Sequence, residues 1–196
     1  WAAPWPQEFD GSKPTGEENK ENRKQETMPQ PPLFIFVGHS GAGKTSFVER
    51  LVGELDRRGL RVATIKHAHH KVELDHSGKD SWRYTQAGAK LSLLLTTGGL
   101  QLVAEAVDRR EPAELAERFL GEADLVLAEG FSQAQGEKIE VLRRAHNPTP
   151  RCTLDDGLIA LVTDVGEVYP ELPRFALDAV GEVADFLLAR SARSAK

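Results

Sequence analysis

The sequence predicts an α/β fold with a mainly parallel sheet flanked by helices. A glycine-rich segment, 38–45, follows an apolar run, 33–37, and comes directly before a stretch in which apolar residues have helical spacing. Beyond it, apolar runs of strand length alternate with amphipathic helical stretches, which is the order typical of parallel sheets. The 196 residues are enough for one such domain with a sizeable core.

The domain is expected to begin at residue 33, after a disordered leader that spans residues 1–32. This stretch contains six prolines and a nearly all-polar segment, 13–27, so it has little apolar surface to bury. We therefore assign 33–196 to a single domain.

Helices are expected where apolar residues recur at helical spacing between boundary signals. The first spans 44–58, with Phe47, Leu51 and Leu55 on one face and Gly59 as the residue that ends it. Further helices are expected at 80–87, 112–120 and 178–190, and proline opens the second of these three.

Strands are expected at 33–37, 61–66, 91–96, 100–106, 124–129, 138–143, 158–163 and 174–177. The runs 124–129 and 158–163 are almost continuously apolar, as strands inside a parallel sheet are. The run 138–143 alternates apolar and charged residues, so we expect a more exposed strand. The segments 91–96 and 100–106 flank a Thr-Gly-Gly sequence, which predicts a pair of strands joined by a tight turn.

The glycine-rich segment matches a phosphate-binding P-loop at every fixed position. Its residues are Gly38, His39, Ser40, Gly41, Ala42, Gly43, Lys44 and Thr45, followed by Ser46. The glycines let backbone N–H groups surround an anion, and the following helix adds the positive end of its dipole. We expect Lys44 to reach the β- and γ-phosphates and the Thr45 hydroxyl to ligate Mg²⁺. An ordinary glycine turn is the alternative.

The position of a residue along its strand decides which acidic residue belongs to this site. Asp124 and Glu129 flank one buried strand and lie about 16 Å apart at 3.3 Å per residue. Ligands of such sheets bind outside the carboxyl ends of the strands. We therefore expect Glu129, and not Asp124, to position Mg²⁺ or an attacking water. A surface acid at a strand end is the alternative.

A polar loop, 67–79, begins at the carboxyl end of the strand that ends with Lys66. We expect it to contact phosphates and Mg²⁺, with Lys66 and Lys79 supplying positive charge and Asp75 or Asp80 reaching the ion. Its histidines include no helical i, i+4 pair, so a preformed zinc site is weakly supported. A solvated loop is the alternative.

Thr163-Asp164 ends another strand and is a candidate for base recognition. A carboxylate there would accept hydrogen bonds from the guanine N1–H and 2-amino groups, a pair of donors that adenine lacks. Asp164 would then favour GTP. A turn or helix-capping aspartate is the alternative.

Composition and charge give weak limits on partners and location. The formal net charge of -5, without a dominant basic patch, gives no sign of a nucleic-acid partner. The single cysteine, Cys152, cannot form a disulfide within the chain and fits a reducing compartment. No apolar run approaches the roughly 20 residues that span a bilayer. A cytoplasmic protein with no membrane partner is expected.

Several segments together resemble one known family. They are Ile65-Lys66-His67-Ala68-His69-His70 followed by Asp75, then Gly78-Lys79-Asp80-Ser81-Trp82-Arg83, Ala87-Gly88-Ala89, Glu129-Gly130-Phe131, and Lys138-Ile139-Glu140-Val141 with Arg143. Through them, residues 33–190 are similar to the molybdopterin-guanine dinucleotide biosynthesis adapter protein family, MobB.

The resemblance implies a P-loop GTPase-like protein related to the nickel-insertion GTPases. It implies GTP and Mg²⁺ binding, weak hydrolysis at most, and a homodimer. It also implies association with the molybdenum cofactor guanylyltransferase, which attaches GMP to molybdopterin, with molybdopterin as a further candidate ligand. Carried over by position, Gly38 to Thr45 hold the phosphates, Thr45 holds Mg²⁺ and Glu129 takes the acidic role. The Asn-Lys-x-Asp motif that reads guanine in many GTPases is absent, and only Thr163-Asp164 stands there.

Two other classes of function use the same residues differently. A small-molecule P-loop kinase would need an acceptor hydroxyl site with a base beside it. A nickel-type metallochaperone GTPase would load a metal on His67, His69, His70 and His76.

Overall fold

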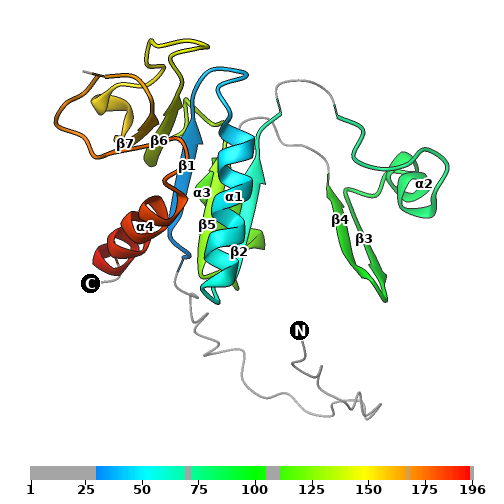
Figure 1. Cartoon of the computed structure of the whole chain (residues 1–196). Helices are drawn as coiled ribbons and strands as arrows, with labels where there is room; N and C mark the ends of the chain where they lie inside the picture. Colours follow the sequence, from blue (N-terminus) through cyan, green and yellow to red (C-terminus); the bar gives the residue numbers. More distant parts are fainter. Residues whose placement is uncertain (1–29, 69–71, 105–110, 167, 195–196) are drawn as a thin grey trace.

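The fold is an α/β structure with a six-stranded parallel sheet and a separate two-stranded hairpin (Figure 1). The computed structural model describes residues 30–68, 72–104, 111–166 and 168–194. Nearly all of the predicted leader, 1–32, lies outside the described residues. Within the described ranges, no helix is long and apolar enough to cross a bilayer.

The helices and strands lie where the sequence predicts them, with small differences at the ends. The helices are α1 (Lys44–Arg57), α2 (Asp80–Gln86), α3 (Pro112–Phe119) and α4 (Val180–Ser194), with a short 3-10 helix, η1 (Leu154–Asp156). The strands are β1 (Leu33–Val37), β2 (Val62–Lys66), β3 (Leu91–Thr96), β4 (Gly99–Ala104), β5 (Leu125–Glu129), β6 (Glu137–Leu142), β7 (Leu158–Thr163) and β8 (Arg174–Phe175).

The main sheet has the strand order β2-β5-β1-β6-β7-β8, and all of its pairs are parallel. The side chains of β1 alternate between two apolar clusters. Phe34 and Phe36 pack with residues of α1 and α4, whereas Ile35 and Val37 belong to a smaller cluster. Because β1 lies between β5 and β6, the loop that follows it emerges in the middle of the sheet edge where ligands bind.

The prediction that residues 138–143 form an exposed strand is wrong. β6 lies between β1 and β7, and Lys138 and Glu140 are only 2% and 0% exposed. Their polar atoms are satisfied inside the fold, because Lys138 Nζ donates to the Asp156 carbonyl at 2.5 Å and Glu140 accepts two backbone N–H bonds. Alternating charge here marks internal hydrogen bonding and not exposure to water.

The predicted pair of strands around the Thr-Gly-Gly turn is confirmed. β3 and β4 form an antiparallel hairpin that pairs with no strand of the main sheet. Figure 1 shows this hairpin standing apart from the main sheet, together with α2. Residues 105 and 106 of the expected second strand lie outside the described residues.

Gly157 gives a test of the packing between β6 and β7. Its φ is +86°, and an added Cβ would lie 2.4 Å from the backbone carbonyl oxygen of Gly136. Gly157→Ala should therefore lower the free energy of unfolding by about 2 kcal/mol or more, measured by chemical denaturation. Gly53 lies in α1 with open space around its Cβ position, so Gly53→Ala should instead stabilise the protein by about 0.5–1 kcal/mol. Equal effects of the two substitutions would contradict this account.

Candidate active site

The segment between β1 and α1 has the backbone of a phosphate cradle. Gly38, Gly41 and Gly43 have φ values of +137°, +79° and +94°, which side chains with a Cβ rarely adopt. Lys44 Nζ folds back over the loop and donates to the carbonyl oxygens of Gly38 at 3.0 Å and His39 at 2.9 Å. Burial lowers the pKa of Lys44, and the charge of Glu129 opposes that effect. The ammonium is thus held at the mouth of the loop by neutral carbonyls.

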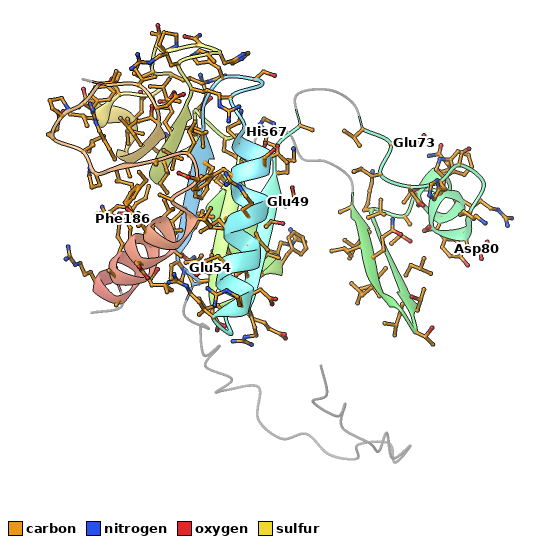
Figure 2. The ribbon with its side chains drawn as sticks, viewed as in Figure 1. Glu49, Glu54, His67, Glu73, Asp80 and Phe186 are labelled. Atoms are coloured by element: carbon orange, nitrogen blue, oxygen red, sulfur yellow. The ribbon has the colours of Figure 1, made fainter. Side chains whose placement is uncertain are left out.

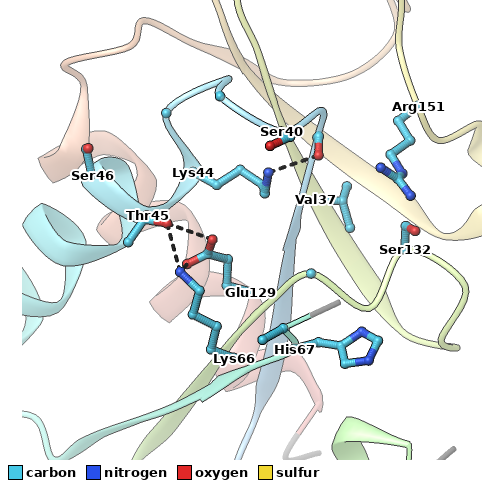
Figure 3. A pocket seen from close by; sticks show the side chains of 15 residues that line it. Val37, Ser40, Lys44, Thr45, Ser46, Lys66, His67, Glu129, Ser132 and Arg151 are labelled. Carbon is cyan, nitrogen blue, oxygen red and sulfur yellow. Dashed lines mark hydrogen bonds and ion pairs between the residues drawn. The ribbon is translucent and has the colours of Figure 1, made fainter. Parts of the chain in front are cut away.

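Glu129 lies beside the P-loop, as its position at the carboxyl end of a strand predicts. The Thr45 hydroxyl donates to the Glu129 carboxylate at 2.7 Å (Figure 3). Lys66 Nζ lies 3.2 Å from the same hydroxyl and 3.4 Å from the other Glu129 oxygen. Asp124 lies at the opposite end of β5, where it pairs with Arg61 at 2.8 Å. A hydroxyl and a carboxylate oxygen at one point are the hard donors that Mg²⁺ prefers, so these residues fit that ion.

These groups line an open pocket of about 690 Å³, which is within the usual size of small-molecule sites. The pocket is shown in Figure 3. Its P-loop wall consists of Val37, Gly38, Ser40, Gly41, Gly43, Lys44, Thr45 and Ser46. The other lining residues come from the ends of β2 and β5, from the loops that follow these strands, and from the loop after β6: Lys66, His67, Ala68, Glu129, Gly130, Ser132 and Arg151.

Three residues expected at the nucleotide site do not line this pocket. The His39 ring turns away and its Nε2 lies 3.1 Å from the Thr149 carbonyl oxygen, although its own carbonyl holds Lys44. Ala42 is buried in the core. Asp164 lies at the end of β7 as expected, but one of its oxygens accepts the Arg144 backbone N–H at 2.7 Å.

Asp75 and Asp80, expected to reach the ion, and Lys79, expected to supply positive charge, do not line this pocket. Asp80 is exposed on α2, 3.7 Å from Arg83, and is drawn far from His67 in Figure 2. Asp75 accepts bonds from the His76 backbone and the Ser81 hydroxyl, so it holds the start of α2. Gln101 of β4 donates a hydrogen bond to the Leu74 carbonyl oxygen at 3.2 Å, so this part of the segment lies beside the hairpin.

The histidines of this loop do not form a metal site in the part of the chain that the structure describes. No group of three or more His, Cys, Asp or Glu side chains with the spacing of a metal site is found there. The His67 ring stacks on Phe131 with centroids 5.0 Å apart. His69 and His70 lie outside the described residues.

The sequence matches the model of the MobB family, "Molybdopterin guanine dinucleotide synthesis protein B", over residues 33–164. The chain belongs to this family. It is 37% identical over 162 residues to the molybdopterin-guanine dinucleotide biosynthesis adapter protein of Haemophilus influenzae, covering 81% of this chain and 88% of the relative. The Escherichia coli adapter protein is 32% identical over 161 residues, with coverage of 80% and 91%. The Bacillus subtilis MobB crystal structure superposes with a TM-score of 0.64 at 28% identity, covering 81% and 96%.

Sequence reasoning missed one wall of the pocket of this MobB family member. Arg151 and Ser132 line the pocket, and His146 lies against Gly41, where an added Cβ would be 3.0 Å from its ring. Arg151 and His146 lie in the irregular stretch between β6 and β7, which has no periodicity that would predict its course. The available signal was the presence of charged residues, Lys138 and Glu140, in a strand that the sheet buries.

Proposed function

We propose that the chain is a GTP-binding adapter protein of molybdenum cofactor biosynthesis, with weak Mg²⁺-dependent GTP hydrolysis. The observation that carries the proposal is the meeting of Lys44, Thr45 and Glu129 in one pocket at the end of β1 and β5. Membership in the MobB family supports the pathway, because the relatives are described as molybdopterin-guanine dinucleotide biosynthesis adapter proteins.

Different residues of the pocket bind different parts of a nucleoside triphosphate. The P-loop N–H groups and Lys44 bind the phosphates, and Lys66 adds a second positive charge beside Thr45. Mg²⁺, when bound by Thr45 and Glu129, would neutralise charge on the phosphate oxygens. Glu129 also orients the attacking water.

Guanine preference is proposed to come from Asp164. Its second carboxylate oxygen accepts hydrogen bonds from the guanine N1–H or 2-amino group, while the Arg144 N–H fixes the first oxygen. The end of β7 is on the same sheet edge as the P-loop, two strands away from β1. This position suits a base whose phosphates lie on the P-loop.

Calorimetric titration with GTP and with ATP, both with Mg²⁺, tests the nucleotide site. We expect tighter binding of GTP, and a loss of about 10-fold to 100-fold in GTP affinity in Lys44→Ala, because charge-assisted hydrogen bonds to phosphate disappear. Unchanged affinity in Lys44→Ala would refute the P-loop assignment. Equal or tighter ATP binding would favour a small-molecule kinase.

The role of Glu129 is tested against an acidic residue at the other end of the same strand. Glu129→Gln should reduce Mg²⁺-dependent GTP hydrolysis by roughly 10-fold to 100-fold, because a neutral amide neither supports the ion nor orients water as well. Asp124→Asn removes a matched carboxylate that pairs with Arg61 at the far end of β5, and should leave the hydrolysis rate close to that of the unaltered protein. The reverse order would overturn the assignment.

The adapter is proposed to act as a homodimer that associates with the molybdenum cofactor guanylyltransferase, and molybdopterin is the further ligand of that assembly. The β3–β4 hairpin supplies the dimer contact. Its alternate residues place five leucines on one face, all at least 36% exposed: Leu91, Leu93, Leu95, Leu100 and Leu102. An isolated two-stranded hairpin is marginally stable in water, so this leucine face is best covered by the same face of a second copy.

Charge on the leucine face should therefore separate the subunits. Leu95→Asp is expected to reduce the mass measured by light scattering from twice 21.6 kDa to 21.6 kDa, because a buried unpaired carboxylate is costly. Leu154→Asp, on η1 and outside the hairpin, is the matched control and should remain dimeric. A dimer that persists in Leu95→Asp would place the contact elsewhere.

A further inference from the structure

The loop that follows β6, residues 143–153, is bonded directly to the P-loop. His146 from this loop makes a hydrogen bond through Nε2 to the Ser40 carbonyl oxygen. His39 from the P-loop reaches back, with its Nε2 3.1 Å from the Thr149 carbonyl oxygen. Two histidines, one from each segment, thus hold the loop across the phosphate cradle. The loop therefore forms one wall of the pocket, and its own hydrogen bonds to the P-loop set the position of that wall.

Beneath this wall lies a fully buried carboxylate. Glu140 of β6 is 0% exposed, and in the sheet it lies opposite Val37, the last residue before the P-loop. Its two oxygens accept the backbone N–H groups of Arg151 at 2.6 Å and of Cys152 at 3.1 Å. Burying a carboxylate is costly, and burial raises the pKa of Glu140 while these two hydrogen bonds oppose that shift. The two hydrogen bonds that offset this cost fix the backbone at Arg151.

The side chain of Arg151 extends from this fixed point into the pocket, on the side that faces Lys44 (Figure 3). Within the described parts of the chain, no carboxylate forms a salt bridge with the Arg151 guanidinium. Its positive charge, like burial, lowers the pKa of Lys44, so the two cations lie close enough to act on one ligand in the pocket. A guanidinium offers planar N–H donors that match phosphate oxygens in pairs.

We propose that Arg151 binds the terminal phosphate of a nucleoside triphosphate in this pocket, and that Glu140 is the positioning residue that holds the Arg151 backbone for this contact. The proposal rests on the proposed nucleotide site and adds two residues to it. Lys44 contacts the phosphates from the P-loop, and Arg151 contacts them from the opposite wall. Because the wall is already ordered, little conformational entropy is lost when the contact forms.

The first experiment compares ligands with and without the terminal phosphate. Dissociation constants for the non-hydrolysable analogue guanosine 5′-(β,γ-imido)triphosphate and for GDP are measured with Mg²⁺ by calorimetry. Arg151→Ala should weaken the analogue about tenfold and GDP less than about twofold, because only the analogue carries the phosphate that Arg151 contacts. Arg118→Ala removes an equal charge from exposed α3 and should change neither constant. Equal weakening of both ligands in Arg151→Ala, or none, overturns the proposal.

The second experiment tests Glu140 through a double-mutant cycle. Glu140→Gln replaces one accepting oxygen by an amide group that cannot accept an N–H bond, so one of the two anchors is lost. In the protein with Arg151, Glu140→Gln should lower the ratio of analogue affinity to GDP affinity. When Arg151→Ala is already present, Glu140→Gln should leave that ratio unchanged. The same reduction in both backgrounds would show a general structural effect and overturn the positioning role. Circular dichroism confirms that each variant is folded at the assay temperature.

The failure of this proposal differs from a failure of the nucleotide site itself. If the unaltered protein binds neither ligand, the proposed function is wrong and the role of Arg151 falls with it. If it binds both ligands, and Arg151→Ala keeps the same affinity ratio, only the role of Arg151 is wrong.

Discussion

The parallel register of β1 with its two neighbours is the constraint on which the pocket depends. In this register Phe36 lies opposite Glu129 of β5 and Val37 lies opposite Glu140 of β6, while Lys66 of β2 lies opposite Glu129 from the other side. Charged residues far apart in sequence are thereby brought to one level of the sheet, directly below the P-loop. A slip of one residue in any of these pairs would turn the side chains to the other face of the sheet. The register itself is held by the two apolar clusters that pack on opposite faces of β1.

The two glutamates at this level have different environments, and the difference gives them different capacities. Glu129 opens onto the pocket, contacts a hydroxyl and an ammonium, and so can exchange partners when a ligand enters. Glu140 is sealed in the sheet with both oxygens used by backbone N–H groups, so a change of partner would leave buried donors unpaired. The first is suited to chemistry and the second to holding a loop in place. The two glutamates lie on the strands that flank β1, and their access to water separates their roles.

Much of this arrangement could be predicted from the sequence, because its signals are local or follow from strand direction. The P-loop has a fixed spacing, and the choice of Glu129 over Asp124 needed only the rule that ligands meet the carboxyl ends of parallel strands. Where the outcome depended on tertiary contacts, prediction failed. The buried state of Glu140 depends on N–H groups eleven and twelve residues later in the chain, so its charge alone predicts exposure. Asp80 lies at the far end of the long loop that follows β2, and the path of such a loop decides whether the residue returns to the site. Arg151 lies in an aperiodic loop, where composition gives no direction.

The hairpin and the pocket also differ in what stabilises them. The pocket is built on a sheet with six strands and two apolar clusters, and its P-loop is tied by Lys44 and by His146. The hairpin has only two strands, with α2 beside it and a leucine face open to solvent. Leucines that stay exposed contribute nothing to the stability of the monomer, since the hydrophobic gain comes only when area is removed from water. The chain connecting the two units leaves the sheet at Lys66, which is also the residue that contacts Thr45 and Glu129. The hairpin with its exposed leucine face is therefore attached to the main sheet directly after a residue of the pocket, so that under the proposed function the contact surface and the nucleotide site lie on one chain.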